Sequence, residues 1–135
     1  MERTRVSSGT EWESAVGYSR AVRAGDEIHV SGTTATDDDG DVVAPNDPGA
    51  QTRRALANVE AALAERDASL SDVVRTRLFV TDIDDWEAVG RAHAEAFGDV
   101  RPATSMVQVE RLIDPRLVVE VEATATAPRD DYRRD

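Results

Sequence analysis

The sequence of 135 residues contains no cysteine and no lysine, and only 4% of it is aromatic. Without cysteine, disulfide frameworks, thiolate nucleophiles and cysteine-ligated zinc sites are excluded. No apolar run approaches the roughly 18–20 residues that span a bilayer, and no secretory leader pattern opens the chain. We therefore expect a cytoplasmic protein with no membrane partner.

Acidic side chains greatly outnumber basic ones in this sequence. The chain carries 27 acidic and 16 basic side chains, for a net charge of −11, and every basic residue is an arginine. A strongly acidic surface repels phosphate backbones, which argues against a nucleic-acid partner. The missing lysine and the excess of aspartate over glutamate favour adaptation to molar salt, where the Debye length falls to about 3 Å. GC-rich codon usage is the alternative explanation for arginine in place of lysine.

A β-hairpin is predicted near the start of the chain. Residues 17–24 and 27–32 have extended, alternating patterns, and Ala24-Gly25-Asp26 between them is typical of a tight turn. Residues 37–41 hold four aspartates and one glycine, but their spacing does not fit a calcium-binding loop. We expect a solvated acidic turn there.

Two amphipathic helices are predicted. The first begins at Asp47-Pro48, a favoured N-cap followed by proline at the first helical position, and reaches about Arg66. The second begins at Asp84, with Glu87 three residues later as in a capping box, and ends at Gly98. Their apolar stripes have helical spacing and consist of Leu56, Val59 and Leu63 in the first helix and of Trp86, Val89, His93 and Phe97 in the second. Because His93 belongs to such a stripe, we expect it to be packed or hydrogen-bonded rather than catalytic.

Three further strands complete the expected fold, over residues 73–81, 104–110 and 117–126. In the first of them, Val74, Leu78 and Val80 are expected to share one face. The predicted order is β-β-α-β-α-β-β, an α+β fold with both helices on one face of a mixed sheet. We expect one domain over residues 1–127 and a polar C-terminal tail over residues 128–135.

The last strand has more apolar positions than two helices are expected to cover. These positions are Leu117, Val119, Val121, Ala123 and Ala125. A self-complementary oligomer would bury the remainder.

Glu120 and Glu122 are two residues apart on this strand and project to the same side of it. Burial and mutual repulsion would raise the pKa of such a pair, as general acid–base chemistry requires. A solvated face, or an interface opposite Arg75, Arg77 or Arg111, explains the pair equally well.

Several strings in a fixed order resemble the RidA/YjgF family of reactive-intermediate deaminases, also described as L-PSP endoribonucleases. The resemblance covers roughly residues 15–127. The strings are GYSRAV from Gly17, VSG from Val30, QTR from Gln51, ASLSDVV from Ala68, FVTD from Phe79, FG at Phe97, RPATS from Arg101 and VEVEA from Val119.

The resemblance implies a chorismate-mutase-like homotrimer with three sites in the clefts between subunits. In the deaminase members, water converts 2-imino or enamine acids to 2-oxo acids and ammonia without a metal or cofactor. An arginine in a P-A-R-S/T string binds the substrate carboxylate, a glutamate in the last strand positions water, and a tyrosine and a Ser-Gly backbone line the pocket.

Carried over by position, Tyr18, Ser31 and Gly32 match the lining residues and Glu120 matches the water-positioning glutamate. Thr104 stands where the deaminases have the arginine. Losing a charged hydrogen bond of about 1.5–3 kcal/mol would cost roughly 10- to 150-fold in transition-state binding.

Arg20 and Arg101 are the candidates to replace the missing arginine as substrate-binding groups. Surface or intersubunit ion pairs are the other role considered for both. Alternatively, Thr104 opens the pocket to a neutral or differently charged ligand, since its hydroxyl can both donate and accept hydrogen bonds.

Two functions remain open. The first is a cofactor-free hydrolase of small imine or enamine metabolites, with Glu120 as the catalytic residue. The second is a non-catalytic, metabolite-binding or protein-protective trimer. A ribonuclease is disfavoured by the charge of −11 and by the lack of paired histidine or lysine groups.

Overall fold

One mixed six-stranded sheet, in the order β1-β2-β3-β6-β4-β5, carries the fold in the computed structural model, which describes residues 2–128. Strands β4 and β5 are parallel, and the other neighbouring strands are antiparallel. The strands are β1 (Arg3–Val6), β2 (Ala21–Ala24), β3 (Glu27–Thr33), β4 (Val73–Val80), β5 (Ala103–Gln108) and β6 (Val119–Thr126).

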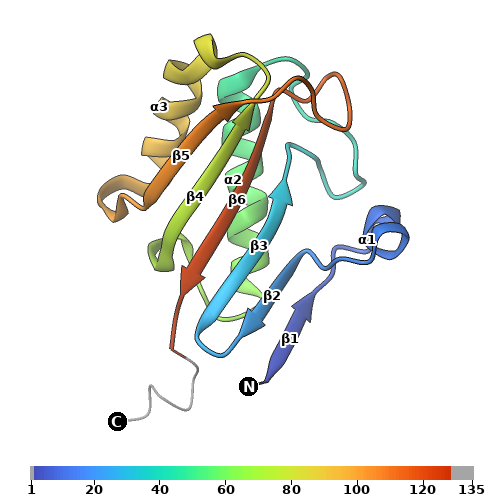
Figure 1. Ribbon diagram of the computed structural model, residues 1–135, viewed down its shortest axis with the longest axis vertical. Helices are drawn as coiled ribbons and strands as arrows, with labels where there is room; N and C mark the ends of the chain where they lie inside the picture. Colours follow the sequence, from blue (N-terminus) through green and yellow to red (C-terminus); the bar gives the residue numbers. More distant parts are fainter. Residues whose placement is uncertain (1, 129–135) are drawn as a thin grey trace.

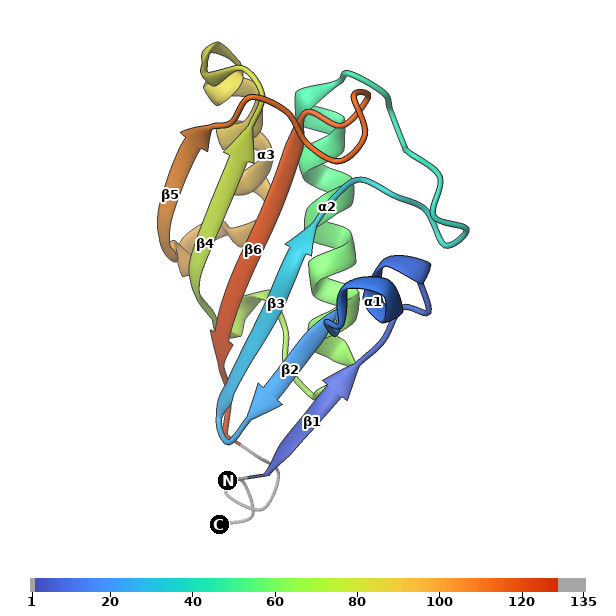
Figure 2. The same ribbon diagram turned by 45° about the vertical axis from the view of Figure 1, so that its right-hand side comes forward.

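Two helices, α2 (Pro48–Ala64) and α3 (Trp86–Phe97), lie side by side against one face of this sheet, and the other face is open (Figures 1 and 2). The short helix α1 (Glu11–Val16) sits beside the ends of β1 and β2. Short 3₁₀ turns occur at η1 (Leu70–Asp72), η2 (Ile83–Asp85) and η3 (Gly98–Val100). No helix in the described part of the chain is long and apolar enough to cross a bilayer. The α+β class, with both long helices on one face, is confirmed.

Helix α2 begins as its sequence predicts. The Asp47 carboxylate accepts the Ala50 N–H at 3.1 Å, with Pro48 in the first turn. The predicted stripe of Leu56, Val59 and Leu63 is fully buried. The helix ends at Ala64, two residues before the predicted end.

The start of the chain differs from the prediction. Strand β1 and helix α1 were not predicted, because β1 has only Val6 buried and α1 has just six residues. Gly17 ends α1 in the left-handed conformation, with φ 87°. The predicted first strand of the hairpin therefore starts at Ala21, and Tyr18 lies in the connection before it.

Strand β4 and helix α3 also differ in detail. A register shift between Val73 and Arg75 leaves Val74 49% exposed and buries Val73 in its place. Helix α3 begins at Trp86, which is exposed rather than part of the buried stripe. The predicted capping box at Asp84 is wrong, since Asp84 lies in η2, where its N–H is bound by the Asp82 carboxylate at 3.0 Å.

The apolar positions of the last strand are all covered within one chain, which corrects the expectation that two helices leave some of them bare. Residues Leu117, Val119, Val121, Ala123 and Ala125 are all buried. The 17-residue α2 contacts both β3 and β6, and the small alanines let it approach closely. The open face instead carries the other parity of β6, including Glu120 and Glu122, together with Phe79 of β4.

The acidic turn behaves as a solvated loop. Asp37 Oδ1 accepts the N–H groups of Asp39 and Asp41, at 3.0 and 2.9 Å. The predicted C-terminal tail lies outside the described residues from residue 129 onward.

Gln51 links α2 to the loop before β6. Its side chain is completely buried; its amide nitrogen donates to the carbonyls of Ala44 and Arg116, and its Oε1 accepts the Val118 N–H at 2.8 Å. Three backbone groups therefore depend on one side chain, and one of them lies two residues before Glu120.

We expect Gln51→Leu to lower the free energy of unfolding by at least about 2 kcal/mol, because unsatisfied buried polar groups cost about 1–3 kcal/mol each. Urea unfolding followed by circular dichroism measures the loss. Gln108→Leu is the control, since Gln108 is exposed and accepts a single bond, from the Ile83 N–H. Equal losses in the two variants would contradict the assigned role of Gln51.

Candidate active site

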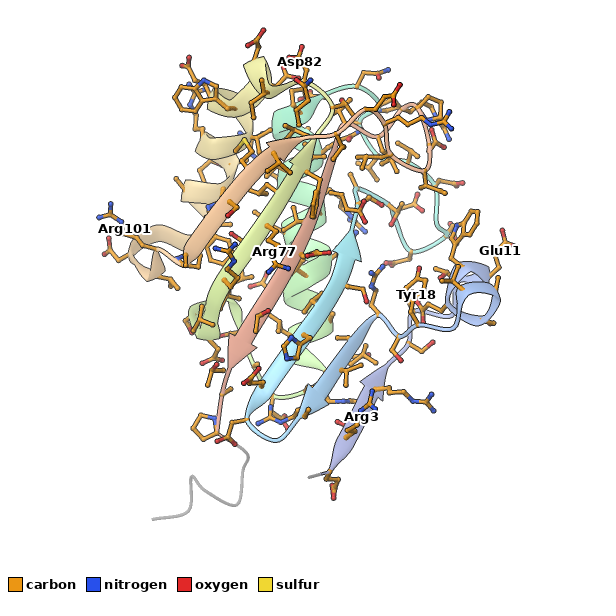
Figure 3. All side chains as sticks on the ribbon, viewed as in Figure 1. Arg3, Glu11, Tyr18, Arg77, Asp82 and Arg101 are labelled. Atoms are coloured by element: carbon orange, nitrogen blue, oxygen red, sulfur yellow. The ribbon has the colours of Figure 1, made fainter. Side chains whose placement is uncertain are left out.

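The two carboxylates of β6 have different partners on the open face. Glu122 lies opposite Arg77 of β4, with 3.5 Å between Arg77 Nη1 and Glu122 Oε1 (Figure 3 shows Arg77 on this face). Glu120 lies opposite Phe79. Within residues 2–128, Glu120 forms no ion pair, so only Glu122 of the two carboxylates has a cationic partner.

Gly32 allows the Glu120 carboxyl group to lie directly on the backbone of β3. A Cβ at position 32 would overlap Glu120 Oε2 and lie 2.9 Å from Glu120 Cδ. The pairing of β3 with β6 is irregular between Val30 and Thr33, which places Gly32 at this approach. Any side chain at position 32 would displace the carboxyl group.

The pKa of Glu120 is raised. Burial is the main cause, and the neighbouring Glu122 adds to it, whereas Arg20 acts in the opposite direction. A carboxyl group in this environment holds its proton to higher pH than an exposed one and can exchange it with a substrate or a water molecule.

Arg20 binds the same residue, Gly32, on which this carboxyl group lies. Its Nη2 donates to the Gly32 carbonyl at 2.5 Å, and its guanidinium carbon lies 5.9 Å from the centre of the Tyr18 ring. Its Nε is buried and has no hydrogen-bond partner among the described residues. The backbone is fixed on both sides, since Arg20 N donates to Val6 O and Ser31 N donates to Arg20 O.

Ser31 holds this segment in place. Its hydroxyl donates to the Ser19 carbonyl at 2.7 Å, so it supports the connection between Tyr18 and Arg20. The structure therefore brings together Tyr18, Arg20, Ser31, Gly32 and Glu120 from the predicted set.

Glu13 is a supporting residue that the sequence interpretation missed. Its carboxylate is bound by the hydroxyls of Ser7, Ser8 and Thr10 and by the Ser8 N–H. Burial opposes its charge, but the bonds from Ser8 and Ser7 outweigh it and lower the pKa of Glu13. Thr10 followed three residues later by Glu13 is a capping-box signature that could have revealed α1, the helix that leads into Tyr18.

Thr104 and Arg101 are not brought to Glu120 within one chain. Thr104 is on β5, at the far edge of the sheet, and pairs with Thr76, whose side chain faces the helices. Arg101 precedes β5 and lies across the molecule from Tyr18 (Figure 3).

The side chains of Thr104, Thr76 and His93 form a hydrogen-bonded row. Thr104 Oγ1 is 2.7 Å from Thr76 Oγ1, which is 2.9 Å from His93 Nε2. The His93 ring packs against Phe97, with 4.6 Å between centroids, and burial lowers its pKa. His93 is thus packed and hydrogen-bonded, as its place in the helix stripe predicts.

A cavity of about 410 Å³ adjoins Arg20, and Glu120 is not among the residues that line it. The segment around Ser8, the loop around Thr36, and Asn58 of α2 line its walls.

Within residues 2–128, one group of acidic side chains could hold a metal ion. Its members are Asp37, Asp39 and Asp41, whose carboxylate oxygens lie within 4.8 Å of one another. Asp37 Oδ1 already accepts the N–H groups of Asp39 and Asp41, and all three aspartates are exposed to solvent.

The family model described as Endoribonuclease L-PSP matches residues 9–127, which include this whole arrangement. The chain belongs to this family, that of the RidA/YjgF proteins. A Streptomyces coelicolor member, the uncharacterised protein SCO2049, is 43% identical over 90% of both chains. The 3-aminoacrylate deaminase RutC of Acinetobacter baylyi is 35% identical over 80% of this chain and 85% of its own.

Solved structures agree with the membership. The crystal structure of Rv2704 from Mycobacterium tuberculosis, described as a member of the YjgF/YER057c/UK114 family, is 55% identical and has a TM-score of 0.85. It covers 93% of this chain and 100% of its own. The fold is therefore that of a RidA/YjgF protein, and the family includes deaminases.

We expect Gly32→Ala to push the Glu120 carboxyl group off β3 and to return its pKa toward the ordinary value, because the group loses its burial. Carbon-13 NMR titration of the Glu120 carboxyl group measures this. Gly90→Ala, where an added Cβ meets nothing within 4 Å, should leave that pKa unchanged and stabilise α3 by about 0.5–1 kcal/mol. An unchanged titration in Gly32→Ala would show that Glu120 does not depend on this contact.

Proposed function

We propose that this protein is a cofactor-free hydrolytic deaminase of small imine or enamine metabolites, with Glu120 as the catalytic residue. The observation that carries the proposal is the partly buried Glu120 carboxyl group, without an ion-pair partner in the described chain, lying against Gly32 with a raised pKa. The 35% identity to a 3-aminoacrylate deaminase supports it.

Glu120 would manage the proton of the attacking water. As the water oxygen bonds to the carbon of the protonated imine, the carboxylate takes a water proton and the C=N electron pair moves to nitrogen, which gives a carbinolamine with a neutral amino group. Glu120 then returns this proton to the amino nitrogen. The C–N bond breaks as the hydroxyl oxygen forms the carbonyl, and the hydroxyl proton passes through Glu120 to the departing ammonia, which leaves as ammonium. The step needs no metal and no redox partner, since its atoms and electrons balance with water alone.

The complete site is proposed to lie between copies of the chain in a homotrimer. Tyr18, Ser31 and Gly32 would line it from one copy, and Thr104 and Arg101 would come from the next. The separation of these two groups within one chain supports a composite site.

A non-catalytic trimer that binds a metabolite or protects other proteins is the second candidate. It is favoured by Thr104, whose hydroxyl is already engaged by Thr76 and by the Pro102 carbonyl at 3.0 Å. A site built this way has no strong anion-binding group at that position.

We expect the wild type to accelerate release of 2-oxo acid from imines that an amino-acid oxidase generates in situ, and Glu120→Gln to lose at least about 100-fold, within the usual contribution of a general base. Multimolar potassium chloride is the medium because of the acidic composition. If the wild type does not hydrolyse these imines but Thr104→Arg does, the natural substrate is not an imino acid. If neither protein hydrolyses them and Glu120→Gln still binds ligand, the binding trimer is favoured.

The acid limb of the pH–rate profile should report Glu120, because a general base works only above its own pKa. Glu122 raises that pKa and Arg20 lowers it; Arg77 is paired with Glu122. Glu122→Gln is therefore expected to move the acid limb to lower pH. A limb that stays in place would assign the titration to another group.

A further inference from the structure

Arg20 carries a positive charge that no described residue neutralises by direct contact. Between residues 2 and 128, no carboxylate lies within ion-pair distance of its guanidinium. Glu13 is occupied by serine and threonine hydroxyls, and Glu122 is paired with Arg77. Glu13 and Glu120 feel Arg20 only through the longer-range field.

The guanidinium is also held in one orientation. Nη2 is bonded to the Gly32 carbonyl, and the Tyr18 ring lies within cation–π range. The buried Nε has no partner in the described chain, although an unsatisfied buried donor is costly. The other terminal nitrogen, Nη1, makes no hydrogen bond within the described chain and is not one of its buried unpartnered atoms. Nη1 is therefore the donor that a ligand can reach, and a carboxylate fits an arginine best because it takes charged hydrogen bonds.

We propose that Arg20 is a specificity-determining residue that binds the carboxylate of an anionic substrate beside Glu120. This rests on the proposed function and concerns which residue holds the substrate carboxylate when Thr104 occupies the usual arginine position. Arg20 takes the place of the arginine that the deaminases have at the position of Thr104, and it approaches the substrate from the connection before β2 rather than from β5. The Gly32 carbonyl and the Tyr18 ring set the angle of approach.

A second consequence follows from the charges around Glu120. Arg20 favours the ionised form of Glu120, Glu122 opposes it, and Arg77 is paired with Glu122. A bound carboxylate cancels the field of Arg20, so Glu120 gains affinity for a proton. Binding of the anion is therefore accompanied by proton uptake.

Binding of a product-like pair tests the proposal without turnover. Pyruvate and pyruvamide differ only in charge and one hydrogen-bonding group, and titration calorimetry measures the affinity of each. The wild type is expected to prefer pyruvate by about 10- to 150-fold, and Arg20→Gln is expected to lose that preference. Arg53→Gln, which removes an exposed arginine of α2 that is paired with Glu95 of α3, should keep it.

Arg20→Lys guards against a folding defect, because it retains the charge and should keep part of the preference. Repeating the titrations in buffers of different ionisation enthalpy measures proton uptake, which should fall in Arg20→Gln. Equal affinities for the two probes in the wild type, or an unchanged preference in Arg20→Gln, would overturn the proposal.

The two proposals fail in different ways. If hydrolysis depends on Glu120 but Arg20→Gln still prefers pyruvate, the role proposed for Arg20 is wrong and the deaminase proposal stands. If binding depends on Arg20 but no hydrolysis occurs, the role of Arg20 stands and the deaminase proposal is wrong.

Discussion

The site depends on the alternation of side chains between the two faces of β6. Val119 and Val121 are fully buried under the helices, and the same pleat forces Glu120 and Glu122 onto the open face. A one-residue slip would exchange the two sets and bury two carboxylates in the core. Gln51 holds the entry to this strand, so the register of the core and the position of the proposed base are set together.

The segment before β2 is ordered by hydrogen bonds rather than by apolar packing. Ser31 and Val6 bind its backbone, and Glu13 closes the loop that leads into it. Tyr18 and Arg20 are thereby presented to Glu120 by a connection with no regular structure of its own. Proposed binding groups on a connection of this kind can differ between relatives while the sheet stays the same.

The fold was largely predictable because its long elements have strong periodic patterns. The stripe of α2 and the Asp47-Pro48 start were correct, and so were the strands after it to within a few residues. The bulge that exchanges Val73 for Val74 has no signal in a pattern of apolar residues. Strand β1 was missed because a single buried residue, Val6, creates no alternation.

The candidate site was only partly predictable. The strings around Tyr18, Gly32 and Glu120 indicated residues that the structure brings together, but no pattern could show that the Nε of Arg20 is left without a partner. The distance between Thr104 and Glu120 depends on β4 lying between β5 and β6, and strand order is a property of the whole fold. Pairing of Arg77 with Glu122 alone, rather than with both glutamates, likewise required the register.

The hydroxyl groups around Glu13 form a cluster whose hydrogen bonds respond to ionic strength differently from the ion pairs of the surface. Ion pairs such as Arg53–Glu95 and Arg77–Glu122 are exposed to solvent, and at 1 M salt the screening length of about 3 Å is no longer than the pairs themselves. Hydrogen bonds from neutral serine and threonine side chains act at contact and are not weakened in this way. The loop that leads into Tyr18 would therefore keep its conformation in concentrated salt, which weakens the ion pairs on the surface of the molecule.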